Sequence, residues 1–145
     1  MKKRTAIVCH SGGMDSSLCL VLAINAHGAE NVLAFNVHYG QRHQQEIVQA
    51  QKICEHFGVD QFNLSIDFLS KITTNALMDA SVEIKKEADE AANTLVLGRN
   101  GLMARLAAIF GHGCDAEQVY MGVIEVEEAN SGYRDCSREY MDLIQ

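Results

Sequence analysis

The feature that most constrains this chain is a six-residue stretch near its start, Ser11-Gly12-Gly13-Met14-Asp15-Ser16. It follows Thr5-Ala6-Ile7-Val8-Cys9, an apolar and partly β-branched run of strand length. It precedes a group of residues that share one face at helical spacing, namely Leu18, Val21, Leu22 and Ala26. The order is therefore strand, tight loop, helix. In such a unit the loop amides and the helix N-terminus together make a concave site for an oxyanion.

The spacing within the loop excludes two common phosphate-binding loops. The chain has no G-x-x-x-x-G-K-[ST], so no lysine reaches the outer phosphates, and no G-x-G-x-x-G for a dinucleotide. Gly12 and Gly13 lack a Cβ, which lets the backbone turn sharply and approach a phosphate closely. The alternative is an ordinary Gly-Gly turn, with Asp15 and Ser16 in a first helical turn that favours carboxylates and hydroxyls.

The S-G-G-x-D-S pattern resembles the pyrophosphate loop of the N-type ATP pyrophosphatases, which split ATP into AMP and pyrophosphate to adenylate a substrate oxygen. The resemblance implies ATP as substrate, with Mg²⁺ bridging its phosphates. The ATP-binding residues would be Cys9, His10, Ser11, Gly12, Gly13, Met14, Asp15, Ser16 and Ser17. Asp15 cannot bind pyrophosphate by charge, so it would hold Mg²⁺ or brace the loop.

Composition limits the kind of protein. The 145 residues suit one domain, 1–145, and a hydrophobic content of 48% argues against disorder. The net charge of −7 argues against nucleic-acid binding, and no apolar stretch is long enough to cross a membrane. The basic start, Met1 to Arg4, leads into an apolar run too short for a signal peptide, so we expect a cytoplasmic protein.

The five cysteines predict neither disulfides nor zinc. They are odd in number, lie far apart, and include no C-x-x-C pair. We therefore expect buried free thiols and a fold that needs no metal.

The rest of the chain alternates between strand and helix patterns. Strands are predicted over 31–37 and 61–66, separated by a helix over 41–57 whose inner face carries Ile47, Ala50, Cys54 and Phe57 and which Gly58 ends. A second helix runs from Gly98 to Phe110, ended by Gly111 and Gly113, followed by a strand over 119–123. This order predicts an α/β fold with a doubly wound parallel sheet, Rossmann-like, whose ligands collect at the carboxyl ends of the strands.

Two segments allow weaker predictions. Residues 67–95 are a long connection that is either a functional flap or a partly mobile segment. A short helix to Leu143 closes the chain and carries Tyr140, Leu143 and Ile144 on a small amphipathic face. Because association is the usual way to bury such a face, we expect a homodimer.

Four blocks narrow the resemblance: S-G-G-M-D-S, H-Y-G-Q-R-H, G-R-N and S-G-Y-R-D-C. Together they are similar to the 7-cyano-7-deazaguanine synthases, the QueC-like branch, which resembles the adenine nucleotide alpha hydrolases in fold. Membership implies that ATP adenylates the carboxylate of 7-carboxy-7-deazaguanine. Ammonia then forms the amide, and a second ATP activates the amide for dehydration to the nitrile.

The resemblance also implies roles for particular residues. The catalytic residues would be Asp15, Ser16 and Arg99, with Arg99 complementing the phosphates. The substrate-binding residues would be Tyr39, Gln41, Arg42, Asn100, Ser131, Gly132, Tyr133 and Asp135. Some of these have plainer explanations: Asn100 can cap a helix, the two tyrosines can pack in the core, and Arg42 and His43 can be surface residues. Nothing in the sequence pairs Cys136 with a base, so it would be structural or site-lining.

This sequence also departs from the family pattern. It lacks the C-terminal four-cysteine segment, so no zinc is expected, and His38 stands at a position that is often acidic. One alternative is a shortened relative that transfers the activated deazapurine to another amine, such as a protein N-terminus. Two further classes stay open: a different small ATP pyrophosphatase, and a non-catalytic nucleotide-binding relative.

Overall fold

The computed structural model describes residues 1–38, 44–72, 98–125 and 134–145. The elements are β1 (Ala6–Cys9), α1 (Met14–His27), η1 (Ala29–Asn31), β2 (Val32–His38), α2 (Gln44–Phe57), β3 (Asp60–Ser65), α3 (Leu69–Ile72), α4 (Arg99–His112), β4 (Gln118–Met121), η3 (Arg134–Cys136) and α6 (Arg138–Ile144). Within these ranges no helix is both long enough and apolar enough to cross a membrane.

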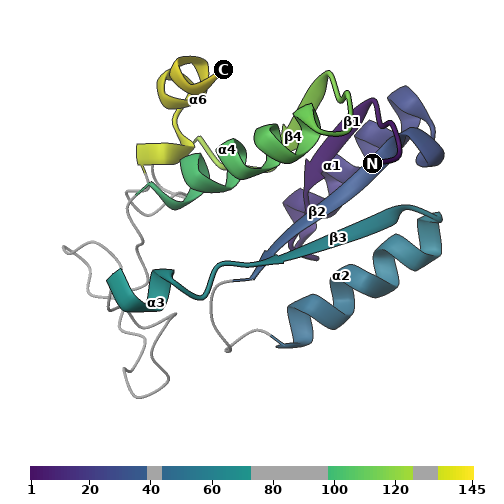
Figure 1. Ribbon diagram of the computed structural model, residues 1–145, viewed down its shortest axis with the longest axis horizontal. Coiled ribbons are helices and arrows are strands. Elements are labelled where there is room, and N and C mark those ends of the chain that lie inside the picture. The colour runs from purple at the N-terminus through teal and green to yellow at the C-terminus, as the bar shows by residue number, and fades with distance from the viewer. Residues whose placement is uncertain (39–43, 73–97, 126–133) are drawn as a thin grey trace.

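The strands form one parallel sheet in the order β3-β2-β1-β4. Helices α1 and α2 cover one face, where Leu20, Ala23 and Cys54 pack on the even-numbered residues of β1 and β2. Helix α4 covers the other face, where Ala107 packs on Ile7 and Phe35 (Figure 1). The predicted doubly wound sheet is therefore confirmed. Because β1 has β2 on one side and β4 on the other, its carboxyl end is the topological switch point, where such sheets bind ligands.

The predicted face of the first helix is wrong. Leu18 and Leu22 remain 58% and 52% exposed, while Ser16, Leu20 and Ala23 are the buried residues of α1. Apolar residues surround this helix on most sides, so helical spacing alone does not select a buried face. The tight loop after β1 fixes the rotation of α1 about its axis, and this rotation decides which residues meet the sheet.

Other predicted boundaries differ by a few residues. Gly111 lies inside α4, buried against Ile7, and only Gly113 follows the helix, as its C-cap. In α2, Ala50 and Cys54 are buried as predicted, but Ile47 and Phe57 lie at the exposed margin. Of the long connection over 67–95, the short helix α3 is described, and residues 73–97 lie outside the described ranges.

A buried arginine links three strands at the end of the sheet away from the loop. Arg4, 5% exposed, donates from Nη1 to the carbonyl oxygens of Glu30 (2.8 Å) and Val32 (3.3 Å), and its Nη2 pairs with the carboxylate of Asp60 at the start of β3. The hydrogen bond and charge of Arg4 hold the pKa of Asp60 below its usual value. Because the folded pKa is depressed, this pair stabilises the fold above the unfolded carboxyl pKa of about 3.9 and the contribution is lost as pH falls below it.

We expect Asp60→Asn to lower the free energy of unfolding at neutral pH by up to about 1 kcal/mol, because it weakens the partner of the buried Arg4 cation, while solvent screens the Asp60 carboxylate, whose side chain is 62% exposed. Denaturant unfolding of wild type and variant should show this difference shrinking as pH falls below about 4. The matched control is Asp115→Asn, which removes the pair between exposed Lys3 and Asp115 (3.0 Å) and should change little. Equal effects of the two substitutions would contradict a structural role for Arg4.

Candidate active site

The loop after β1 turns at one glycine and starts α1 at the next. Gly12 has φ +84°, in the region that favours glycine, whereas Gly13, the N-cap of α1, has φ −76°. No side chain caps this end of α1, and the first helical hydrogen bond runs from the N–H of Ser17 to the carbonyl of Gly13. The N–H groups of residues 14–16 precede that bond, so the first turn has the donors and the positive dipole end that bind anions.

Serine hydroxyls hold this loop in shape. Ser16 Oγ accepts from the N–H of Ser11 (3.2 Å) and donates to the carbonyl of Gly13 (3.0 Å). Ser17 Oγ also donates to the Gly13 carbonyl, at 2.7 Å. Ser11 Oγ lies 3.2 Å from Ser16 Oγ and accepts from the N–H of Gly13 at 3.4 Å. Ser16, which is buried, therefore braces the loop, while Ser11 is exposed at its surface.

Helix α2 packs directly against Gly12. A Cβ at residue 12 would lie 2.8 Å from both the backbone nitrogen of Ala50 and the carbonyl oxygen of Glu46. A Cβ at Gly13 would meet only Ser11 Oγ, at 3.4 Å. Only Gly12 is thus required by packing, and Gly13 leaves room for an approaching ligand.

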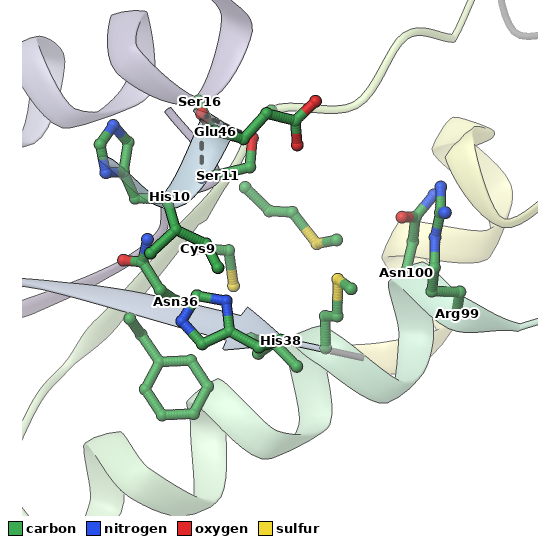
Figure 2. Close-up of a pocket in the computed structure, with 15 residues that line it drawn as sticks. Cys9, His10, Ser11, Ser16, Asn36, His38, Glu46, Arg99 and Asn100 are labelled. Atoms are coloured by element: carbon green, nitrogen blue, oxygen red, sulfur yellow. Dashed lines mark hydrogen bonds between the residues drawn. The ribbon is translucent and has the colours of Figure 1, made fainter. Parts of the chain in front are cut away.

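A cavity of about 300 Å³ opens beside the loop at the carboxyl edge of the sheet (Figure 2). The described residues that line it are Cys9, His10, Ser11, Ser16, Phe35, Asn36, Val37, His38, Glu46, Ile47, Arg99, Asn100, Met103, Met121 and Gly122. Figure 2 shows Ser11 and Ser16 on one side of this space, with Arg99 and Asn100 across from them at the start of α4. The loop donors and a guanidinium therefore border the same cavity, an arrangement that suits an anionic ligand.

The residues of η3 organise the start of α4. The Asp135 carboxylate accepts from the backbone N–H of Asn100 at 2.8 Å, and Asn100 Nδ2 donates to Cys136 Sγ at 3.1 Å. A carboxylate at a helix N-terminus is favourable, and it offsets the placement of the Arg99 cation at the same positive end. Asp135 is buried and is not among the described residues that line the cavity. Its hydrogen bond therefore supports a capping role, and substrate contact by Asp135 stays a prediction.

Apart from Asp135, which lies in η3, the predicted site residues fall into three groups. Those that line the cavity are Cys9, His10, Ser11, Ser16, Arg99 and Asn100. A second group lies in or next to the loop but is not part of the described cavity lining: Gly12, Gly13, Met14, Asp15 and Ser17. Those outside the described ranges are Tyr39, Gln41, Arg42, Ser131, Gly132 and Tyr133.

Sequence reasoning missed the residues contributed by strand ends and by the sides of helices. Gly122, just after β4, packs so closely on α1 that a Cβ there would lie 2.9 Å from the backbone carbon of Asp15. Asn36 is 2% exposed, lines the cavity, and has an Oδ1 without a hydrogen-bond partner in the structure. Asn36 and Gly122 each follow an apolar strand segment. Their position near the carboxyl ends of predicted strands is the sequence signal that could have identified them as site residues.

Burial keeps two groups of the cavity wall, Cys9 and His10, and the nearby Cys136 neutral. It lowers the pKa of His10, whose Nε2 lies 3.3 Å from Ser17 Oγ and whose Nδ1 lies 3.7 Å from Cys54 Sγ. Burial and the nearby Cys19 raise the pKa of Cys9 to about 12. Burial and the carboxylate of Asp135 raise the pKa of Cys136. Neither thiol is a thiolate at neutral pH, which agrees with a structural or site-lining Cys136.

All five cysteines are free, as predicted. Among the residues that the structure describes, no three His, Cys, Asp or Glu side chains converge as metal ligands. This finding does not bear on Mg²⁺, which is usually held by one or two carboxylates together with substrate phosphates. Asp15 in the loop and Glu46 on the cavity wall are carboxylates of that kind.

Comparisons with known proteins extend these observations. Residues 5–145 match the model of a family described as "Queuosine biosynthesis protein QueC". The chain is 34% identical over 148 residues to a 7-cyano-7-deazaguanine synthase from Oceanobacillus iheyensis, a match that covers 100% of this chain and 65% of the relative. The chain thus spans just under two thirds of that relative's length.

Solved structures support the fold. An NH3-dependent NAD synthetase from Campylobacter jejuni matches 98% of this chain and 69% of its own, at 14% identity and a TM-score of 0.54. A glutamine-dependent NAD+ synthetase from Acinetobacter baumannii matches 48% of this chain and 13% of its own, at 28% identity and a TM-score of 0.41. The first shares the Rossmann-like fold, and the second match is too partial for a comparison of folds. The family match over nearly the whole sequence, on a loop and sheet of this geometry, establishes that the chain belongs to the QueC family.

Proposed function

We propose that this chain uses ATP to adenylate the carboxylate of 7-carboxy-7-deazaguanine, on the route to 7-cyano-7-deazaguanine. The observation that carries the proposal is the uncapped first turn of α1 and Arg99 of α4, which border one cavity at the switch point of the sheet. Family membership and the relative's name support the deazaguanine substrate.

The loop would bind the phosphates of ATP. The hydroxyl of Ser11 is a donor in the cavity lining, and the uncapped amides of the first turn of α1 follow it in the chain. Gly13 leaves space for a phosphate to approach these amides. Mg²⁺ held by Asp15, with Glu46 as a second carboxylate, would neutralise phosphate charge as pyrophosphate leaves. Ser16 would act by keeping the loop amides in place, because its hydroxyl hydrogen-bonds to the loop itself.

The chemical need for ATP follows from the substrate. A carboxylate is a poor electrophile, and its conversion to an adenylate gives it AMP as a leaving group. The carboxylate oxygen attacks the α-phosphorus, the bond to pyrophosphate breaks, and negative charge builds on the departing group. Arg99 would stabilise that charge, and its position across the cavity from the loop supports this role (Figure 2). Ammonia would then displace AMP, and a second ATP would drive dehydration of the amide to the nitrile.

We expect 7-carboxy-7-deazaguanine to stimulate pyrophosphate release from ATP in the presence of Mg²⁺. Pyrophosphate and AMP should be measured with and without the deazaguanine and with and without ammonium, and the products identified by mass spectrometry. Tyr133→Ala should reduce the stimulation far more than it reduces ATP affinity, since this tyrosine is predicted to stack on the heterocycle.

The controls separate the alternatives. Pyrophosphate release that ignores the deazaguanine would indicate a different small ATP pyrophosphatase. ATP binding without any release would indicate a non-catalytic relative. If AMP and pyrophosphate are released but product forms only with an amine other than ammonia, the adenylation step is correct. The acceptor of the activated deazapurine is then that amine rather than ammonia.

A further inference from the structure

A hydrogen-bond chain at the end of β2 involves one ring nitrogen of His38. The Nε2 atom of His38 lies 3.2 Å from Oδ1 of Asn63 on β3, and Nε2 of Gln61 donates to the same Oδ1 at 3.2 Å. An amide oxygen only accepts, so with the two amides in these orientations Nε2 of His38 is the donor. In that tautomer Nδ1 of His38 is a hydrogen-bond acceptor.

The strand order directs that acceptor toward the cavity. β2 lies between β3 and β1, and Nε2 of His38 points to β3. The two ring nitrogens lie on opposite sides of Cε1, so Nδ1 points away from β3, toward the side of β1 where Cys9 and Ser11 line the cavity. Figure 2 shows the imidazole at the end of β2 projecting into this space.

The surroundings of His38 suit a flat heterocycle. Apolar side chains that line the cavity are Phe35, Val37, Ile47, Met103 and Met121. The titratable and charged groups on the same walls are Cys9, His10, Glu46 and Arg99. Burial keeps Cys9 a thiol and His10 neutral. An acceptor with apolar walls around it favours a planar base that offers an N–H group.

We propose that Nδ1 of His38 accepts a hydrogen bond from an N–H group of the base bound in this cavity, and that Asn63 is the positioning residue that holds His38 in the accepting tautomer. The inference rests on the proposed function. Two bases offer such a group: the adenine of ATP, through its amino group, and the deazapurine, through its N–H edge.

Calorimetry with ATP and with 7-carboxy-7-deazaguanine, each alone, tests the proposal. His38→Leu should weaken one probe by about tenfold, the cost of one lost hydrogen bond to a buried donor. His38→Gln, which keeps an acceptor, should restore most of that affinity. Asn63→Leu, which removes the acceptor that orients the ring, should weaken the same probe and lower the share of His38 rings that carry the proton on Nε2. The probe that responds identifies the base.

Nitrogen NMR of His38 in the wild type provides a readout independent of the variants' stability and should show the proton on Nε2. A proton on Nδ1 would overturn the inference. So would equal affinities of wild type and folded His38→Leu for both probes, and in those cases the proposed function stands. If the wild type binds neither probe, both proposals fail together.

Discussion

Replacement of Asp15 by alanine is expected to abolish pyrophosphate release while the fold is retained. Asp15 is exposed in the first turn of α1, and the buried side of that helix is formed by Ser16, Leu20 and Ala23. The substitution therefore removes no core contact, and the loss of a carboxylate near a helix N-terminus costs about 0.3 to 1 kcal/mol. By contrast, deletion of one group that stabilises transition-state charge typically costs about 100-fold or more in rate.

The measurement is pyrophosphate release together with thermal unfolding. Asp15→Asn separates the two roles of the carboxylate, because asparagine keeps the shape and an acceptor but loses the charge. If Asp15 holds Mg²⁺, Asp15→Asn should be as inactive as Asp15→Ala; if it only braces the loop, Asp15→Asn should be close to wild type. Asp115→Asn, at an exposed carboxylate before β4, serves as a control, because asparagine tolerates the φ of +56° at this position. Wild-type release by Asp15→Ala would show that the loop is not the ATP site.

The second large effect is expected from Gly12→Ala, which should remove ATP binding and destabilise the protein. At φ +84° an alanine is strained by about 1 to 2 kcal/mol. The new Cβ would also lie 2.8 Å from backbone atoms of Ala50 and Glu46, and a helix backbone cannot yield as a flexible side chain can. The loop and α2 must separate, which disrupts the first-turn donors of α1.

Gly58→Ala is the matched control for backbone strain. Gly58 also has a positive φ, +67°, but a Cβ there would have nothing within 4 Å. It should cost stability through strain alone and leave ATP affinity unchanged. Denaturant unfolding and calorimetry with ATP compare the two variants. Equal losses of stability with retained ATP binding in both would show that the contact between Gly12 and α2 is unimportant.

The sequence by itself was sufficient for the four strands, the longer helices, their order and the position of the phosphate loop, but it did not predict the short helices η1, α3 and η3. Strands of four to seven residues followed by helices have distinct periodicities, and β1, β2, β3 and β4 all lie within a few residues of their predicted bounds. The loop was identifiable because Gly12 and Gly13 interrupt the pattern between a strand and a helix. The roles of Tyr39, Gln41, Arg42, Ser131, Gly132 and Tyr133 remain predictions, since these residues lie outside the described ranges. The homodimer also remains a prediction.

Tertiary structure decided which side of each element faces inward and which distant residues share the cavity. Helix α1 is apolar on most sides, so only its exit from the loop determined that Leu20 rather than Leu18 is buried. Sequence spacing could not show that Gly122 packs on Asp15, that Asp135 caps α4, or that His38 and Asn63 meet across two strands. Such contacts depend on strand order and on helix rotation, and both are set by the packing of the whole sheet, because local periodicity carries no information about partners far along the chain.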